Sequence, residues 1–335
     1  MTSSHALGVA AVPRKHWLFS DLWLPNGWAT VAFVVLSGYG VGYLFSTREQ
    51  AERDAALINR CMRILAVMFI SNFIFCALDQ VFHTHQAFSL LNLKWWIGFF
   101  TLDTDWTISG ILLPTALTLL GGPFLIRACQ RATWITLAVL IVFRITVTLL
   151  RPLLADTVYA EGWILKFLLF KGFGFPVLIF VLNGFLGIWL GIFHRCCAGK
   201  AWSHALVVLM FLQVLLYFSS FNQTPSLLIS IVSSFGALAK FAWVFAVALL
   251  LTRIHFFPIV SMIGIIGKYS LGSFIAHRVF LQAIDISWTH FFRNLLFPGY
   301  YYCVLVISTL VLTWTLCVLR DRYPAVNRCF KRLAL

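Results

Sequence analysis

Long apolar runs separated by short polar segments make up most of the chain. Within the runs apolar residues follow one another without alternation, and most runs hold about 20 residues, which is enough for a helix to cross a bilayer. Continuous runs favour helices over the alternating strands of a membrane barrel. The pattern predicts nine spanning helices, at 28–46, 62–82, 106–126, 132–150, 163–193, 203–220, 226–252, 269–285 and 300–319.

Two apolar segments depart from a simple spanning helix. The run 163–193 is too long for one straight helix, and Gly172, Gly174 and Pro176 predict a break after an interfacial piece. The segment 88–100 is apolar but short, so we expect an interfacial or re-entrant piece there. The predicted fold class is therefore an all-α polytopic membrane protein.

Lysine and arginine residues predict the orientation of these spans. If the segment 47–61 is cytoplasmic, so is every second polar segment, and these segments hold 15 of the 25 Lys and Arg residues. Five lie on the opposite side, and such a bias places the richer side in the cytoplasm. The prediction is thus an extracytoplasmic segment 1–27, a multi-span domain 28–319 and a basic cytoplasmic tail 320–335.

Composition supports a membrane protein and argues against other classes. Hydrophobic residues make up 61% of the chain and charged residues 11%, so part of the apolar surface must face lipid. The net charge of +14 arises mainly from short loops between apolar runs, so we expect the bilayer and no nucleic acid as a partner. The eight cysteines show no CxxC pair and no metal-ligand spacing, and we expect no metal.

Three segments combine polar and small residues within or beside the spans. Residues 33–40 (FVVLSGYG) include Ser37 and Gly38 and suit either close helix packing or a substrate site. Arg60 and Arg63 share one helix face at the predicted cytoplasmic mouth of a span. They suit either an orientation anchor or a clamp for phosphate groups, which the arginine fork fits.

The third segment is residues 267–277 (GKYSLGSFIAH). His277 would lie about 13 Å along the helix from Lys268, at a depth where a histidine is costly and becomes a candidate functional group. The alternative is a structural hydrogen bond between helices. Both interpretations stay open from the sequence.

These three segments, in this order, resemble the membrane-bound acyltransferase-3 superfamily. Its members carry a Phe-Phe-Val-Leu-Ser-Gly-like segment, then an Arg-x-x-Arg pair, then a late helix with Gly, Ser and His at the spacing of Gly267, Ser270 and His277. Leu271 replaces the usual tyrosine of that helix. Trp106, in the segment WTIS, resembles the family's Trp-Ser-Leu segment more weakly.

The resemblance implies a membrane enzyme that transfers an acyl group, most often acetyl, from cytoplasmic acyl-CoA to a hydroxyl of a carbohydrate or cell-envelope glycan. It implies acyl-CoA as donor substrate, no permanently bound cofactor, and the cell inner membrane as location. Arg60, Arg63 and Lys268 would bind the donor. Ser37, Gly38, Trp106, Ser270 and His277 would belong to structural or substrate-site motifs.

The family's first helix, which ends in a histidine thought to be the catalytic base, has no counterpart in the predicted spans. Family members have ten core spans, whereas nine are predicted here. His5 lies 32 residues before Ser37, close to the family distance, and is the predicted base. We therefore expect that the first family helix is missing from this chain, which puts the activity of the chain as given in question.

Two other functions fit the same pattern. A transporter or flippase for a lipid-linked or anionic solute would use basic residues near membrane depth, such as Arg144, Lys166, Lys171 and Lys240. The chain shows no internal repeat of the kind that many transporters carry. A catalytically inactive relative that acts as an assembly partner is the third possibility.

Overall fold

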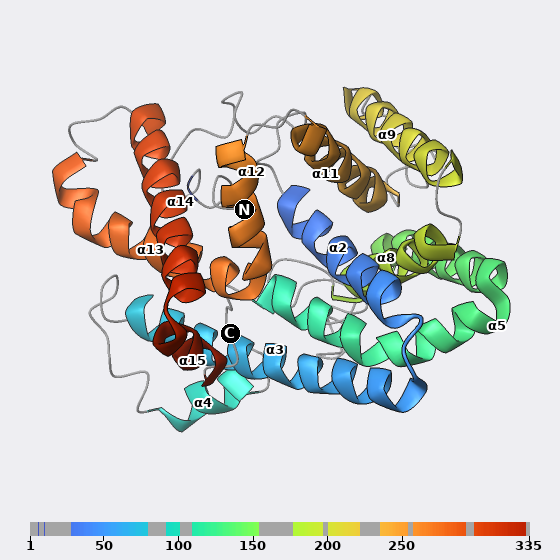
Figure 1. The fold of residues 1–335 in the computed structure, drawn as a ribbon, viewed down its shortest axis with the longest axis horizontal. Helices are drawn as coiled ribbons and strands as arrows, with labels where there is room; N and C mark the ends of the chain where they lie inside the picture. The colour runs from blue at the N-terminus through green and yellow to red at the C-terminus, as the bar shows by residue number, and fades with distance from the viewer. Residues whose placement is uncertain are drawn as a thin grey trace. The chain divides into compact units, whose positions relative to one another are not determined.

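The computed structural model describes most of the predicted spans and part of the segments between them. The described residues are 6, 10, 28–79, 92–100, 109–153, 177–196, 200–221, 235–253, 257–292 and 298–332. In these residues the regular structure is helical, as the apolar runs predict (Figure 1). The chain divides into two compact units, which we call the central unit (Thr30–Ala77 and Gln86–Ala246) and the terminal unit (Met1–Ala29, Leu78–His85 and Val247–Leu335).

Apolar helices make up the central unit. Its helices are α2 (Trp28–Phe45), α3 (Gln50–Asp79), α4 (Leu93–Phe100), α5 (Ser109–Leu153), α8 (Val177–Cys196), α9 (Lys200–Phe221) and α11 (Gly236–Arg253), of which α2, α3 and α11 extend past its boundary. Most of α8 is buried, which matches its apolar sequence on all faces. The predicted interfacial segment 88–100 contains the short helix α4.

Helices α2 and α8 approach each other at glycine positions. A Cβ atom on Gly38 would overlap the carbonyl oxygen of Gly184, and one on Gly187 would overlap that of Val35. Four residues further along both helices, Gly191 meets the carbonyl oxygen of Tyr39 in the same way. Because these contacts advance together along both helices, the two helices are parallel. Such backbone contact is what small residues allow between membrane helices.

Helix α5 contains a sharp bend. Its 45 residues would extend about 68 Å if straight, more than twice the hydrocarbon thickness. Ala132 leaves helical geometry, with φ −153° and ψ 73°, and divides α5 into two arms. The prediction of a loop at 127–131 is wrong, because these residues are helical and the helix changes direction at Ala132. Trp189 of α8 donates to the carbonyl oxygen of Thr133 at 3.0 Å, just after the bend.

Helix α3 begins earlier than the hydropathy pattern predicts. The segment 47–61 was expected to be a loop, but α3 starts at Gln50 and runs for 30 residues. One side of residues 50–60 is buried, through Arg53 and Leu57, while Arg60 on the same stretch is exposed. Hydropathy alone could not separate a polar helix from a loop.

The terminal unit is built on an antiparallel helix pair. Its described helices are α12 (Phe257–Lys268), α13 (Ser270–Phe292), α14 (Pro298–Arg322) and α15 (Pro324–Arg332). Tyr301 donates to Asp285 at 2.8 Å near one end of α13 and α14, and Ser273 lies 3.2 Å from the sulfur of Cys317 near the other. The predicted tail 320–335 thus includes the end of α14 and a further short helix.

Four of the described helical segments are long and apolar enough to cross a membrane. They are Gln50–Ala77, Ile111–Leu150, Val177–Cys196 and Tyr300–Arg322. Large apolar side chains such as Phe124 and Trp134 are exposed on them, at 71% and 64%, as expected of surfaces that face lipid. Shorter apolar helices occur at Val31–Phe45, His204–Leu215 and Gly236–Val247. The molecule is a helical membrane protein, and the predicted number of nine spans stays a prediction.

Candidate functional site

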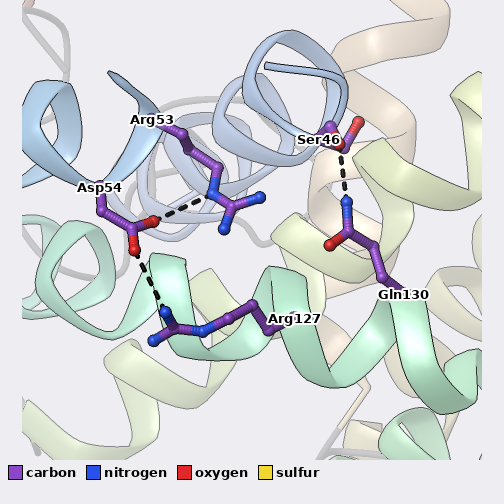
Figure 2. A network of polar contacts seen from close by, with 5 residues as sticks. All are labelled: Ser46, Arg53, Asp54, Arg127 and Gln130. Atoms are coloured by element: carbon purple, nitrogen blue, oxygen red, sulfur yellow. Dashed lines mark hydrogen bonds and ion pairs between the residues drawn. The ribbon is translucent and has the colours of Figure 1, made fainter. Parts of the chain in front are cut away.

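Polar residues gather in the central unit where α2 ends and α3 begins (Figure 2). The carboxylate of Asp54 accepts from Arg53 Nε at 3.1 Å and from Arg127 Nη1 at 3.2 Å. Gln130, one turn after Arg127 on α5, donates to the carbonyl oxygen of Ser46 at 2.8 Å. These contacts join the start of α3 and the end of α2 to the first arm of α5. We call these five residues the polar cluster.

The polar cluster carries a net positive charge and a buried donor. Asp54 neutralises one of its two arginine partners, so one positive charge remains on Arg53, Asp54 and Arg127 together. Arg53 is only 2% exposed, and its Nη2 has no hydrogen-bond partner among the described residues. An unsatisfied buried guanidinium nitrogen is costly, which makes this a place where an anion would be stabilised.

Arg60 and Arg63 lie about three turns after the start of α3 at Gln50, whereas the sequence analysis expects them at the mouth of a span. Both are exposed on one side of the helix, and in the described part of the chain neither has a hydrogen-bond or ion-pair partner. The opposite side of the same turn is buried through Cys61 and Ile64. The two guanidinium groups are therefore available to an anionic ligand or to the phosphate groups of the bilayer.

An aromatic group joins α8 to α2 and α9. The Tyr39 hydroxyl lies 2.5 Å from His194 Nδ1, and the His194 ring stacks on Trp202 with 4.4 Å between centroids and 4° between planes. Arg195 Nη1 donates to the carbonyl oxygen of Tyr43 at 2.5 Å. Apart from Tyr39, which lies in the segment 33–40, the sequence analysis did not single out these residues. The only indication of this contact in the sequence is that a histidine and an arginine follow directly after an apolar run.

The third sequence motif forms a tight polar contact in the terminal unit. Lys268, the last residue of α12, donates to Asp321 of α14 at 2.5 Å, and the Tyr269 hydroxyl donates to the same carboxylate at 2.8 Å. The hydrogen bond to Asp321, followed by that with Tyr269, raises the pKa of Lys268. Lys268 is thus held in an ion pair within the protein. Ser270 is exposed beside it at the start of α13.

Gly272 of the same motif makes room for an arginine. A Cβ atom on Gly272 would lie 3.1 Å from Nη1 of Arg320, which is tighter than an ordinary contact. The Arg320 guanidinium lies over the rings of Tyr269, at 4.3 Å, and Phe330, at 5.0 Å. These cation–π contacts hold the end of α14 between α13 and α15. The presence of Gly272 and Tyr269 in the motif therefore has a structural explanation.

His277 is buried, with 4% of its surface exposed. Its Nδ1 lies 3.2 Å from the carbonyl oxygen of Ser273, one turn earlier in α13. Ser273 in turn contacts the carbonyl oxygens of Ile266 and Tyr269 at 3.0 Å. These contacts link the motif internally, which favours the structural interpretation of His277 over a role in contact with substrate.

The predicted site residues fall into three groups. Ser37, Gly38, Arg60 and Arg63 lie in the central unit, where Gly38 faces α8 and the two arginines are exposed on α3. Lys268, Ser270 and His277 lie in the terminal unit. The predicted base His5 and the predicted motif residue Trp106 lie outside the described residues.

Comparisons of the chain with protein-family models, curated proteins and solved structures find no match. The resemblance to the acyltransferase-3 superfamily therefore depends on the order of short motifs in the sequence. Among the described residues no group of three or more His, Cys, Asp or Glu side chains could hold a metal ion.

Proposed function

We propose that this protein is a membrane acyltransferase that moves an acyl group, most often acetyl, from cytoplasmic acyl-CoA to a hydroxyl of a carbohydrate or cell-envelope glycan. The observation that supports this proposal best is the arginine pair on α3. Arg60 and Arg63 are exposed on one helix side and lack partners in the described structure, so they can receive phosphate groups. The proposed location is the inner membrane, with the C-terminus in the cytoplasm.

The polar cluster would extend the donor site along α3. Arg53 precedes Arg60 by seven residues, which is two helical turns or about 10 Å. The nucleotide of coenzyme A carries a diphosphate and a separate 3′-phosphate, so two groups of cations at this separation suit it. Arg53 and Arg127 would then attract one phosphate group and the exposed pair Arg60 and Arg63 the other.

The chemical step needs a base for the acceptor hydroxyl, and His5 is the proposed base. Its imidazole would take the hydroxyl proton while the oxygen attacks the thioester carbonyl. The carbon–sulfur bond then breaks, the new ester forms, and the coenzyme A thiolate leaves and takes up a proton. No permanently bound cofactor is needed for this transfer. Lys268 is proposed as a secondary donor contact that would first have to exchange its ion pair with Asp321.

The proposal predicts a loss of acetyl-CoA binding when the arginine pair is changed and a loss of acetyl transfer when His5 is changed. Arg60→Ala or Arg63→Ala should weaken acetyl-CoA binding by about 1.5–3 kcal/mol, because each removes hydrogen bonds to a charged group. Lysine at either position should rescue binding only in part, since it lacks the fork. In a form of the protein that shows transfer activity, His5→Ala should leave binding intact and abolish most transfer of labelled acetyl from acetyl-CoA. Binding can be followed by calorimetry on the purified protein, and transfer by release of the free thiol.

One control variant and two contrary outcomes separate this proposal from its alternatives. Arg131→Ala removes another exposed cation of the central unit and should leave acetyl-CoA binding unchanged. If Arg60→Ala and Arg63→Ala bind acetyl-CoA normally but the protein inserts in the wrong orientation, the pair is an orientation anchor. Full transfer activity after His5→Ala would exclude His5 as the base.

A second candidate function is transport of an anionic or lipid-linked solute, and Arg144 favours it. Arg144 lies in the second arm of α5, is 7% exposed, and donates through Nε to Asn183 of α8 at 3.3 Å. A buried arginine within a predicted span is a functional candidate by default. Uptake of solute by proteoliposomes without consumption of acetyl-CoA would favour the transporter.

A further inference from the structure

The C-terminal end of the terminal unit concentrates positive charge. Between residues 320 and 335 the sequence has one acidic residue, Asp321, and this carboxylate already binds Lys268. The same segment carries five cations, which are Arg320, Arg322, Arg328, Lys331 and Arg332. The charge of this segment is therefore not balanced by acidic residues of its own.

Helix α15 separates its cations from the side that contacts the protein. Val326, Asn327 and Phe330 are half-buried and lie on adjoining positions of the helix. Arg320 of α14 holds this side, because its Nε donates to Asn327 at 3.4 Å and its guanidinium covers Phe330. The remaining side carries Arg328 and Lys331, which are both exposed and which we call the basic face.

The basic face lies at the end of a helix that is able to cross the membrane. The candidate span Tyr300–Arg322 ends one residue before Tyr323, which is 55% exposed, and Pro324 begins α15. Tyrosine at such an end is typical of the headgroup region. A short helix with one basic side, directly after a spanning helix, is positioned beside the lipid headgroups.

We propose that the basic face of α15 binds the phosphate groups of anionic phospholipids in the adjoining leaflet. Two exposed cations on one side, without acidic neighbours on α15, complement a surface of lipid phosphates. Arg320 contacts α15 from within the protein, so the helix is already positioned when the lipids bind. This partner does not depend on acyl transfer, because any chemistry of the spans leaves the basic face unchanged.

The test uses the full chain in phosphatidylcholine vesicles that contain spin-labelled phosphatidylglycerol. The fraction of labelled lipid immobilised by the protein is compared with that of spin-labelled phosphatidylcholine. Replacing Arg328 and Lys331 together by glutamine should lower the preference for phosphatidylglycerol, by about fivefold per cation at low salt. The effect should shrink as salt rises.

A charge-keeping variant is the matched control. Arg328→Lys leaves two cations on the basic face and should retain the preference. Both positions are exposed, so neither variant should change the thermal stability of the protein in detergent. An unchanged preference in the glutamine variant would overturn the proposal. Displacement of the labelled lipid by acetyl-CoA would assign the basic face to a soluble nucleotide and overturn it as well.

Discussion

At the scale of single residues, the contact between α2 and α8 makes a sharp prediction. Gly38→Ala would place a methyl group against the Gly184 carbonyl, which is backbone and cannot rotate away. Forcing such an atom into a packed site costs about 1–3 kcal/mol. Gly38→Ala should therefore lower the free energy of unfolding by about that amount, measured by denaturant titration in detergent micelles.

Gly40 provides the control on the same helix. No atom lies within 4 Å of a Cβ placed there, so Gly40→Ala should be tolerated or slightly stabilising. Equal destabilisation by both variants would show that loss of glycine from α2 matters for a reason other than its contact with α8.

The same residues show what the sequence could and could not predict. The small residues of the segment 33–40 predict close packing as one of two interpretations, and the structure shows that contact for Gly38. The partner helix could not be predicted, because any apolar helix with small residues would have fitted. The stacking of His194 on Trp202 was missed for a similar reason, since it joins residues from two separate helices.

At the scale of helices, Asp54 joins α3 to the first arm of α5. Asp54→Ala would leave Arg53, which is 2% exposed, without its carboxylate partner. Stranding a buried donor costs about 1–3 kcal/mol. We expect a drop of that size in the free energy of unfolding at neutral pH. Glu52→Gln, which breaks the exposed pair with Arg48 on the same turn, should cost less than about 1 kcal/mol. If the two variants cost the same, the polar cluster does not stabilise this helix contact.

Helix boundaries were less predictable than helix positions. Apolar runs placed α3, α5, α8, α9 and α14 correctly, because long apolar segments leave few alternatives in a bilayer. The sequence predicts loops at 47–61 and 127–131, yet residues 50–61 and 127–131 are helical, and the two segments contact each other through Asp54 and Arg127. Burial of a charged residue such as Arg53 depends on a partner from a distant segment, which hydropathy does not include.

At the scale of the whole molecule, the parallel contact of α2 and α8 constrains the path of the chain. Two parallel spans must have an odd number of spans between them, because the direction of crossing alternates. If α3 and each arm of α5 cross the bilayer once, three spans lie between α2 and α8, and α8 runs in the direction of α2 as the fifth span. The parallel direction of α2 and α8 agrees with the predicted order of the first five spans.

The orientation itself is open to a direct test. In a cysteine-free variant, single cysteines in place of Lys94, Arg131 and Arg328 all stand at exposed positions. The bias of Lys and Arg predicts that an impermeant thiol reagent labels position 94 in intact cells and positions 131 and 328 only after permeabilisation. The opposite pattern would reverse the predicted topology, and would place the arginine pair of α3 on the side without cytoplasmic acyl-CoA.

The glycine contact also has a consequence for biosynthesis. Gly38 enters the membrane well before Gly184, since 145 residues separate them in the sequence. At about 5–20 residues per second, translation of that interval takes roughly 7–30 s. Throughout that delay the small-residue side of α2 has no native partner and must rest against lipid, the translocon or an insertion chaperone. Completion of the central unit is therefore a late event. A nascent chain that stalls before α8 would leave the small-residue side of α2 open to association with other membrane helices.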